Sequence, residues 1–179
     1  MATAQESAQT ELGAEEIEKD QYLVFKIASQ EFAIQAARVQ EISRVVPTTQ
    51  VPTAPSYIEG ILNLRGQLAT VINFRRKFAL GHKEPDEDTR IIIVEHGGFP
   101  IGVLVDSVEE VIRIPDEKVQ TLPEAAATTV SRDYITGVGM LENRLVVVLD
   151  ADKILTKGEF AEAEAAISSA LGGEAKKTA

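Results

Sequence analysis

The chain has 179 residues, a length that suits one sizeable domain or two small ones. Its hydrophobic fraction of 44% is enough for a core, and with few aromatics and no Trp that core must consist of Val, Ile, Leu and Ala, which favours strands. The net charge of −10 excludes the basic surface that nucleic-acid binding needs, and the lack of Cys excludes disulfides and thiolate metal sites. No stretch reaches the roughly 20 apolar residues of a membrane span.

Residues 1–20 are polar and strongly acidic. They hold six acidic residues against one lysine, and they lack the apolar core of a signal peptide. We expect them to form a disordered acidic tail, because this composition cannot bury enough apolar surface to order the chain.

The next 60 residues predict a series of strands. Pro47, Pro52 and Pro55 mark an extended connection that cannot be helical. The dipeptide Arg65-Gly66 predicts a hairpin turn, and Asn73 is placed to cap a short helix. The expected strands are 22–27, 31–35, 39–46, 57–64 and 67–73, and the helix is 74–80.

After a charged linker the same order of elements begins again. Asp150 is placed to cap a second short helix, 151–155. Residues 157–179 form a C-terminal helix and tail, with the helix expected at 159–171. One face of that helix is apolar, with Phe160, Ala163, Ile167 and Leu171. The expected strands of this half are 90–95, 99–105, 108–114, 134–141 and 145–149.

The two halves also match residue by residue. A shift of 69 places segment 39–42 (VQEI) on 108–111 (VEEV), and a shift of 77 places Tyr57 and Gly60 on Tyr134 and Gly137. This pattern indicates an internal duplication. Five short strands per half predict barrels, with halves of roughly 21–80 and 89–156 and with exchange of strands between them left open.

Several segments of the chain resemble the CheW-like chemotaxis coupling family. They are 57–66 (YIEGILNLRG), 71–78 (VINFRRKF), 101–111 (IGVLVDSVEEV), 134–137 (YITG) and 144–150 (RLVVVLD). The resemblance covers about residues 21–156, and the order and spacing of the segments together are highly specific. The chain departs from the family pattern at Asn73, where Asp is usual, but Asn also caps helices.

This resemblance implies a fold class and a function. The fold is all-β, with two tandem five-stranded SH3-like barrels, short helices and a C-terminal helix. The function is that of a non-catalytic adaptor, which couples the cytoplasmic helices of chemoreceptors to the regulatory domain of a chemotaxis histidine kinase. Such a protein is cytoplasmic and is recruited to membrane-associated receptor arrays. An adaptor of the same fold in a pilus-motility or other kinase system remains the alternative.

The candidate receptor-binding residues follow from the resemblance and from strand geometry. Arg65 lies in the predicted turn, where its guanidinium could hold receptor carboxylates. Val39 and Glu41 are two apart on a strand and share one face, while Val108 and Val111 belong to the equivalent strand of the second half. The alternatives are a solvated turn arginine and an ordinary valine at the barrel rim.

The resemblance implies that the kinase contacts the first barrel, where the candidate residues are Ile34, Arg38, Ile42 and Arg44. Simple core positions for Ile34 and Ile42 are an open alternative. Four glycines are expected to be structural because they lie in or beside strands, namely Gly60, Gly66, Gly102 and Gly137. The basic segment 75–77 is expected to be a solvated helix face.

Nothing in the sequence requires catalysis. His82 and His96 have no partner at ligand spacing, and no nucleophile elbow or phosphate loop is present. We therefore expect a protein without enzymatic activity, cofactor or metal, whose partners are proteins.

Overall fold

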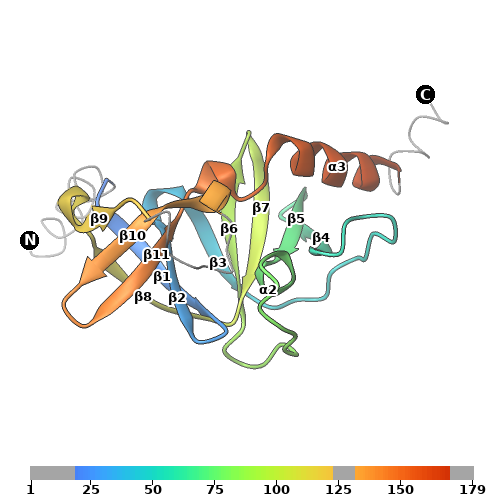
Figure 1. The fold of residues 1–179 in the computed structure, drawn as a ribbon. Helices are drawn as coiled ribbons and strands as arrows, with labels where there is room; N and C mark the ends of the chain where they lie inside the picture. Colours follow the sequence, from blue (N-terminus) through green and yellow to red (C-terminus); the bar gives the residue numbers. More distant parts are fainter. Residues whose placement is uncertain (1–18, 123–131, 170–179) are drawn as a thin grey trace, which may run out of the picture.

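The computed structural model describes residues 19–122 and 132–169, and most of its regular structure is β (Figure 1). The strands of the first half are β1 (Gln21–Ile27), β2 (Gln30–Gln35), β3 (Val39–Arg44), β4 (Ile58–Leu64) and β5 (Gln67–Asn73). Those of the second half are β6 (Arg90–His96), β7 (Phe99–Val105), β8 (Ser107–Arg113), β9 (Val119–Gln120), β10 (Ile135–Leu141) and β11 (Arg144–Leu149).

The helices are few and short. The α-helices are α2 (Phe74–Lys77) and α3 (Lys157–Ile167), and single 3-10 turns cover Ala36–Arg38, Asp116–Lys118, Arg132–Tyr134 and Ala151–Lys153. Asn73 and Asp150 both cap as predicted, accepting hydrogen bonds from the backbone N–H groups of Arg76 and Asp152. The expected acidic tail, residues 1–20, lies almost wholly outside the described residues.

Two sheets contain all of the described strands. One has the order β8-β1-β2-β11-β10-β9 and the other β3-β6-β7-β5-β4. Neighbouring strands are antiparallel except for two parallel pairs, β2 with β11 and β5 with β7. Each sheet curls into a barrel-like unit, so the predicted all-β class is confirmed (Figure 1). The short strand β9 was not predicted, and it gives the first sheet a sixth strand.

The two barrel-like sheets do not coincide with the two halves of the sequence. In the first sheet, the hairpin β1–β2 comes from the first half of the sequence and the other strands, β8–β11, come from the second half. In the second sheet, the hairpin β6–β7 comes from the second half and the other strands, β3–β5, come from the first half. Under the internal duplication the two strand orders are equivalent, apart from β9. The division into residues 21–80 and 89–156 therefore describes the repeat, whereas each barrel is built from both halves.

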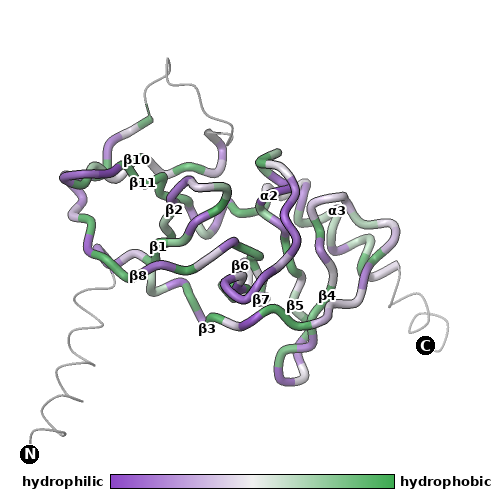
Figure 2. Tube along the Cα trace, turned by 90° about the horizontal axis from the view of Figure 1, so that it is seen from below, coloured by the Kyte–Doolittle hydropathy of each residue, from purple (hydrophilic) through white to green (hydrophobic). Residues whose placement is uncertain are grey.

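The described residues form four apolar clusters, three of them in and between the sheets and the smallest beneath α3. One cluster lies within the first sheet and includes Val24 and Val146, and another lies within the second and includes Val71 and Ile91. The largest cluster draws residues such as Phe25 from both sheets and fills the space between them. Figure 2 shows hydrophobic (green) and hydrophilic (purple) stretches alternating along the tube through both sheets. The barrels are thus held together by a continuous core, and we expect them to unfold as one unit.

The position of each strand explains its sequence pattern. In β6, Ile91 and Ile93 face the inside of their barrel while Ile92 and Val94 face the core between the barrels. A strand buried on both faces reads as a continuous aliphatic run. In β3, at the edge of its sheet, exposed and half-buried residues alternate, as a strand with one free face requires.

The boundaries of several elements differ from the prediction. The third strand ends at Arg44, ahead of Pro47, and α2 ends at Lys77 where residue 80 was expected. The predicted helix 151–155 is a single 3-10 turn. The C-terminal helix begins two residues early, and Leu171 of its expected apolar face lies outside the described residues.

Close packing explains Gly60 and its repeat counterpart Gly137. A Cβ atom on Gly60 would lie 2.7 Å from the backbone oxygen of Thr49, and one on Gly137 would lie 2.6 Å from that of Gln120. Both glycines follow a register shift in their hairpins. In each case the absence of a side chain lets the segment that precedes the strand pass close to the strand's backbone. Gly102 is similar, because its Cβ would lie 2.9 Å from the Ile91 side chain.

Replacing Gly60 with alanine is expected to destabilise the fold by about 1–3 kcal/mol, because a backbone oxygen cannot move aside as a side chain can. Urea unfolding followed by circular dichroism measures the change. Gly158→Ala is the matched control, since nothing lies within 4 Å of an added Cβ there. Equal unfolding midpoints for Gly60→Ala and the unsubstituted chain would contradict the close approach.

Candidate functional site

Arg65 occupies the tip of the β4–β5 hairpin, as predicted. Arg65 and Gly66 have φ angles of 53° and 87°, so both adopt the left-handed conformation that a two-residue turn of this type requires. The side chain of Asn63 supports the turn by accepting a hydrogen bond from the Gly66 N–H at 2.8 Å. The guanidinium is 83% exposed, so the turn presents a cation to solvent.

Glu41 is the partner of this arginine. Glu41 is on strand β3, and its carboxylate lies 3.0 Å from Nη2 of Arg65 at the hairpin tip. The sequence reasoning selected both residues separately, and the structure brings them together. Exposed ion pairs of this kind contribute little to stability, so the pair is free to exchange its partner for a carboxylate of another protein.

Two of the three candidate valines lie at the margin of the core between the barrels. Val39 and Val108, which are equivalent in the repeat, are both half-buried against that core. Val111 is 50% exposed and lies on β8, at the edge of the other sheet. No contact joins Val111 to the Arg65–Glu41 pair among the described interactions, so the structure forms only part of the candidate receptor site as a local cluster.

The candidate kinase-binding residues separate into two groups. Ile42 and Arg44 lie on the exposed face of β3, and Ile42 is 44% exposed. Ile34 belongs to the core between the barrels, with an exposed fraction of 2%, so a partner could not reach it in the folded chain. For Ile34 the core alternative applies, because β2 is a central strand covered on both faces.

Arg38 is held in a contact within the protein. Its Nη2 atom lies 2.6 Å from Asp152 Oδ1 and donates to the backbone oxygen of Glu95 at 3.0 Å. The hydrogen bond with Asp152 raises the pKa of Arg38 and lowers that of Asp152. Arg38 thus fixes the 3-10 turn before β3 to the one after β11.

The basic segment 75–77 was predicted to be a solvated helix face. This holds for Arg76, which is exposed and pairs with Glu59 at the surface, but it is wrong for Arg75 and Lys77. Arg75 forms a bidentate contact with Asp106, at 2.9 Å from Nε and 2.7 Å from Nη2. Burial opposes ionisation of Asp106, but hydrogen bonds from Arg75 and from the Ala28 N–H outweigh it and keep the pKa of Asp106 below its usual value. The side chain of Lys77 is buried as well. Arg75 and Lys77 anchor α2, and nothing in the sequence indicates these long-range partners.

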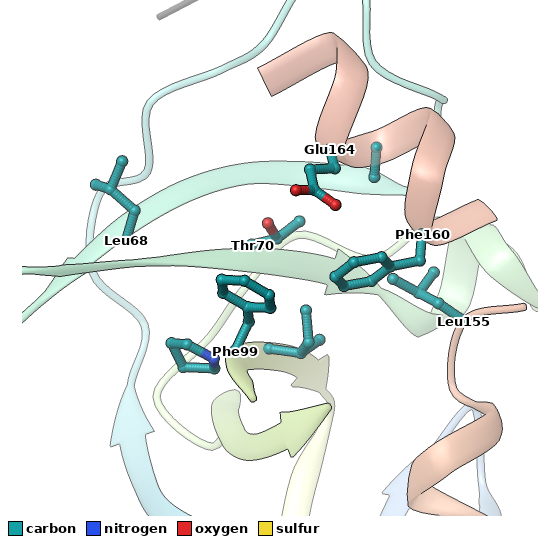
Figure 3. A pocket seen from close by; sticks show the side chains of 9 residues that line it. Leu68, Thr70, Phe99, Leu155, Phe160 and Glu164 are labelled. Carbon is teal, nitrogen blue, oxygen red and sulfur yellow. The ribbon is translucent and has the colours of Figure 1, made fainter. Parts of the chain in front are cut away.

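The sequence reasoning missed an apolar pocket of about 130 Å³ beside α3. Figure 3 shows Phe99 and Phe160 turned toward one another in it, with Leu68 at its rim. Leu68 and Phe99 are each 52% exposed. A second exposed apolar pair, Met140 and Leu145, lies directly across the β10–β11 hairpin. Strand alternation alone does not reveal such positions, because exposure depends on which faces the barrels cover.

No group of three or more His, Cys, Asp or Glu side chains within residues 19–122 and 132–169 is arranged to hold a metal ion. In the same part of the chain no helix is long and apolar enough to cross a membrane. His82 lies 2.8 Å from Glu84 on the surface, and the ring of His96 packs against that of Phe160.

Three comparisons relate the chain to known proteins. The model of the CheW-like domain family matches residues 21–159. The chemotaxis protein CheW of Klebsiella aerogenes is 33% identical over 141 residues, covering 79% of this chain and 84% of that protein. The CheW protein of Helicobacter pylori is 34% identical over 137 residues, covering 76% and 82%. Among solved structures, the scaffolding protein TtCheW from Thermoanaerobacter tengcongensis matches with a TM-score of 0.71 and 30% identity, covering 78% of this chain and 90% of that one.

Proposed function

The chain belongs to the CheW-like family, and from this membership we propose that it is the adaptor that couples chemoreceptors to a chemotaxis histidine kinase. The observation that carries the proposal is the match over nearly all of the described residues, together with an exposed cation at the β4–β5 hairpin. The similar proteins are named as chemotaxis proteins, which favours this role over that of an adaptor in a pilus-motility system. The solved relative TtCheW is named a scaffolding protein, which supports a role in assembly and not in catalysis.

We propose that the receptor contacts the surface containing Glu41, Arg65 and Val39 on one sheet, with Val108 and Val111 on the edge strand of the other sheet as a second part of the contact. The exposed guanidinium of Arg65 suits carboxylates on receptor helices. The half-buried Val39 lies on the same face of β3 as Glu41 and would supply apolar contact beside this charge. Bundled receptor helices would present both kinds of group on one face.

We propose that the kinase regulatory domain contacts the exposed face of β3, at Ile42 and Arg44. This strand is at the edge of its sheet, and its outer face carries an apolar side chain flanked by polar ones. Arg38 would support this surface by fixing the turn ahead of β3 rather than by contact. Receptor and kinase would thus meet opposite faces of the same strand, because residues 41 and 42 point to opposite sides.

Isothermal titration calorimetry tests the adaptor role. The chain is titrated separately with a cytoplasmic receptor fragment and with the kinase regulatory domain, both from the same genome. Binding to each partner is the expected result. A well-folded chain that binds neither partner would contradict the proposal.

Ile42→Asp tests the kinase surface. We expect the dissociation constant for the regulatory domain to rise about tenfold, because a charge would replace an apolar contact at an exposed position that the fold does not need. Receptor binding should stay the same. Leu145→Asp is the control, since it makes the same change at an exposed residue of the other sheet. If only Leu145→Asp weakened kinase binding, the kinase surface would lie on the β10–β11 hairpin and not on β3.

A further inference from the structure

Lys77 and Glu159 form a buried ion pair between α2 and α3. Lys77 Nζ lies 2.6 Å from Glu159 Oε2, and the lysine side chain is only 2% exposed. Its ammonium also lies over two aromatic rings, 4.3 Å from the centroid of Tyr57 and 4.6 Å from that of Tyr134. These two tyrosines are equivalent in the repeat. The two halves of the duplication therefore enclose one lysine, whose partner comes from the C-terminal helix.

The same glutamate also starts the helix. Glu159 Oε1 accepts a hydrogen bond from the Thr156 N–H at 2.9 Å, while Thr156 Oγ1 accepts one from the Glu159 N–H at 3.1 Å. This is a complete capping box. The hydroxyl of Tyr134 donates to the same carboxylate at 3.0 Å. One carboxylate thus joins the start of α3 to both the lysine and the tyrosine.

The electrostatics of this cluster favour an ionised glutamate. Burial opposes its ionisation, but the hydrogen bonds from Lys77 and from the Thr156 N–H outweigh burial and lower the pKa of Glu159. Burial, with the nearby charge of Glu159, raises the pKa of Tyr57 to about 12, so the ring remains neutral. Removing the lysine would leave a partly buried carboxylate without its counter-charge, which is strongly unfavourable.

Outside this cluster, the contacts of α3 come from its apolar face, where the ring of Phe160 packs against those of His96 and Phe99. Among its described side chains the buried ones are two small alanines, Ala163 and Ala166, while Phe160 and Ile167 are only half-buried. The helix has 11 residues, and isolated helices of fewer than about 12–15 residues are marginal in water. An undocked α3 would therefore lose its helical structure.

We propose that α3 is an order–disorder latch, folded only while Glu159 is paired with Lys77 between the two tyrosines. This inference goes beyond the adaptor role and does not depend on it. When the latch is closed, α3 supplies one wall of the pocket that contains Phe99 and Phe160 (Figure 3). When it opens, Phe160, Ala163 and Glu164 leave that pocket, and the apolar residues beneath α3, such as Val51 and Ile61, become exposed.

Hydrogen–deuterium exchange on the full chain tests the latch with Lys77→Met. We expect the amides of residues 160–167 to exchange about a hundredfold faster or more, because a buried pair is broken. The amides of β6 and β7 should keep their protection. Arg76→Met is the matched control, since Arg76 is the neighbouring cation of α2 and pairs with Glu59 on the surface.

Glu159→Gln separates the ion pair from the capping box. Glutamine at this position can still accept the hydrogen bond from the Thr156 N–H, but it carries no charge for Lys77. The latch predicts that Glu159→Gln also releases α3. Unchanged protection of α3 in both variants would overturn the proposal, and so would an equal loss of protection in α3, β6 and β7.

Discussion

Arg65→Glu is expected to weaken binding of the receptor fragment roughly thirtyfold or more, the loss that marks an energetically dominant interface residue. The side chain is exposed at the tip of a hairpin, and its partner Glu41 is on the same surface. Inverting the charge would repel both Glu41 and any receptor carboxylate. The fold should be retained, because surface ion pairs contribute at most about 1 kcal/mol. Calorimetric titration measures the binding, and thermal melting measures the stability.

Two further variants make this result specific. Glu142 is the repeat counterpart of Arg65 and is exposed at the tip of the β10–β11 hairpin, so Glu142→Arg is a charge change of equal size at an equivalent position. It should leave receptor binding unchanged. The double variant Glu41→Arg with Arg65→Glu restores an ion pair of reversed polarity and should still bind weakly. Full recovery in the double variant would mean that the pair, and not the arginine as a contact, matters.

Phe25→Ala is expected to destabilise the chain by about 3–5 kcal/mol, the usual cost of removing a fully buried phenylalanine. Phe25 belongs to the core between the barrels, and its ring lies 5.9 Å from that of Phe32 and 6.4 Å from that of Phe74. Urea unfolding followed by circular dichroism measures the loss. A single cooperative transition at lower urea is expected, since both barrels share this core.

Phe99→Ala is the matched control for this prediction. Phe99 is half exposed at the rim of the pocket beside α3, so its removal should cost about 1 kcal/mol or less. Two separate unfolding transitions in Phe25→Ala would contradict the view that the core between the barrels makes them one folding unit.

The fold could be predicted from sequence to a large extent because its signals are local. Alternation, proline positions and turn residues indicated the strands, and the repeat indicated two similar units. The turn at Arg65-Gly66 follows from residues that tolerate or favour positive φ in a two-residue hairpin. The exchange of hairpins between halves was not predictable, because β1 has the same pattern whether it pairs with β8 or with a strand of its own half.

The candidate site was less predictable because it depends on what covers each face. Glu41 and Arg65 were selected separately, yet only the curvature of the sheet brings them to 3.0 Å. Both Ile34 on β2 and Ile42 on the next strand, β3, are isoleucines, but Ile34 is buried in the core and Ile42 is exposed. Lys77 was expected to be solvated. Sequence does not reveal its partner Glu159, which is 82 residues away along the chain.

The central claim is that this chain links two proteins at once, and the measurement that tests it most directly is size-exclusion chromatography with light scattering of a three-component mixture. The receptor fragment and the kinase regulatory domain are mixed with and without the chain. The adaptor role predicts that all three elute together, and that the receptor fragment and regulatory domain elute separately when the chain is left out. If the two partners instead displaced each other from the chain, they would share one surface and the claim of a bridging adaptor would be wrong.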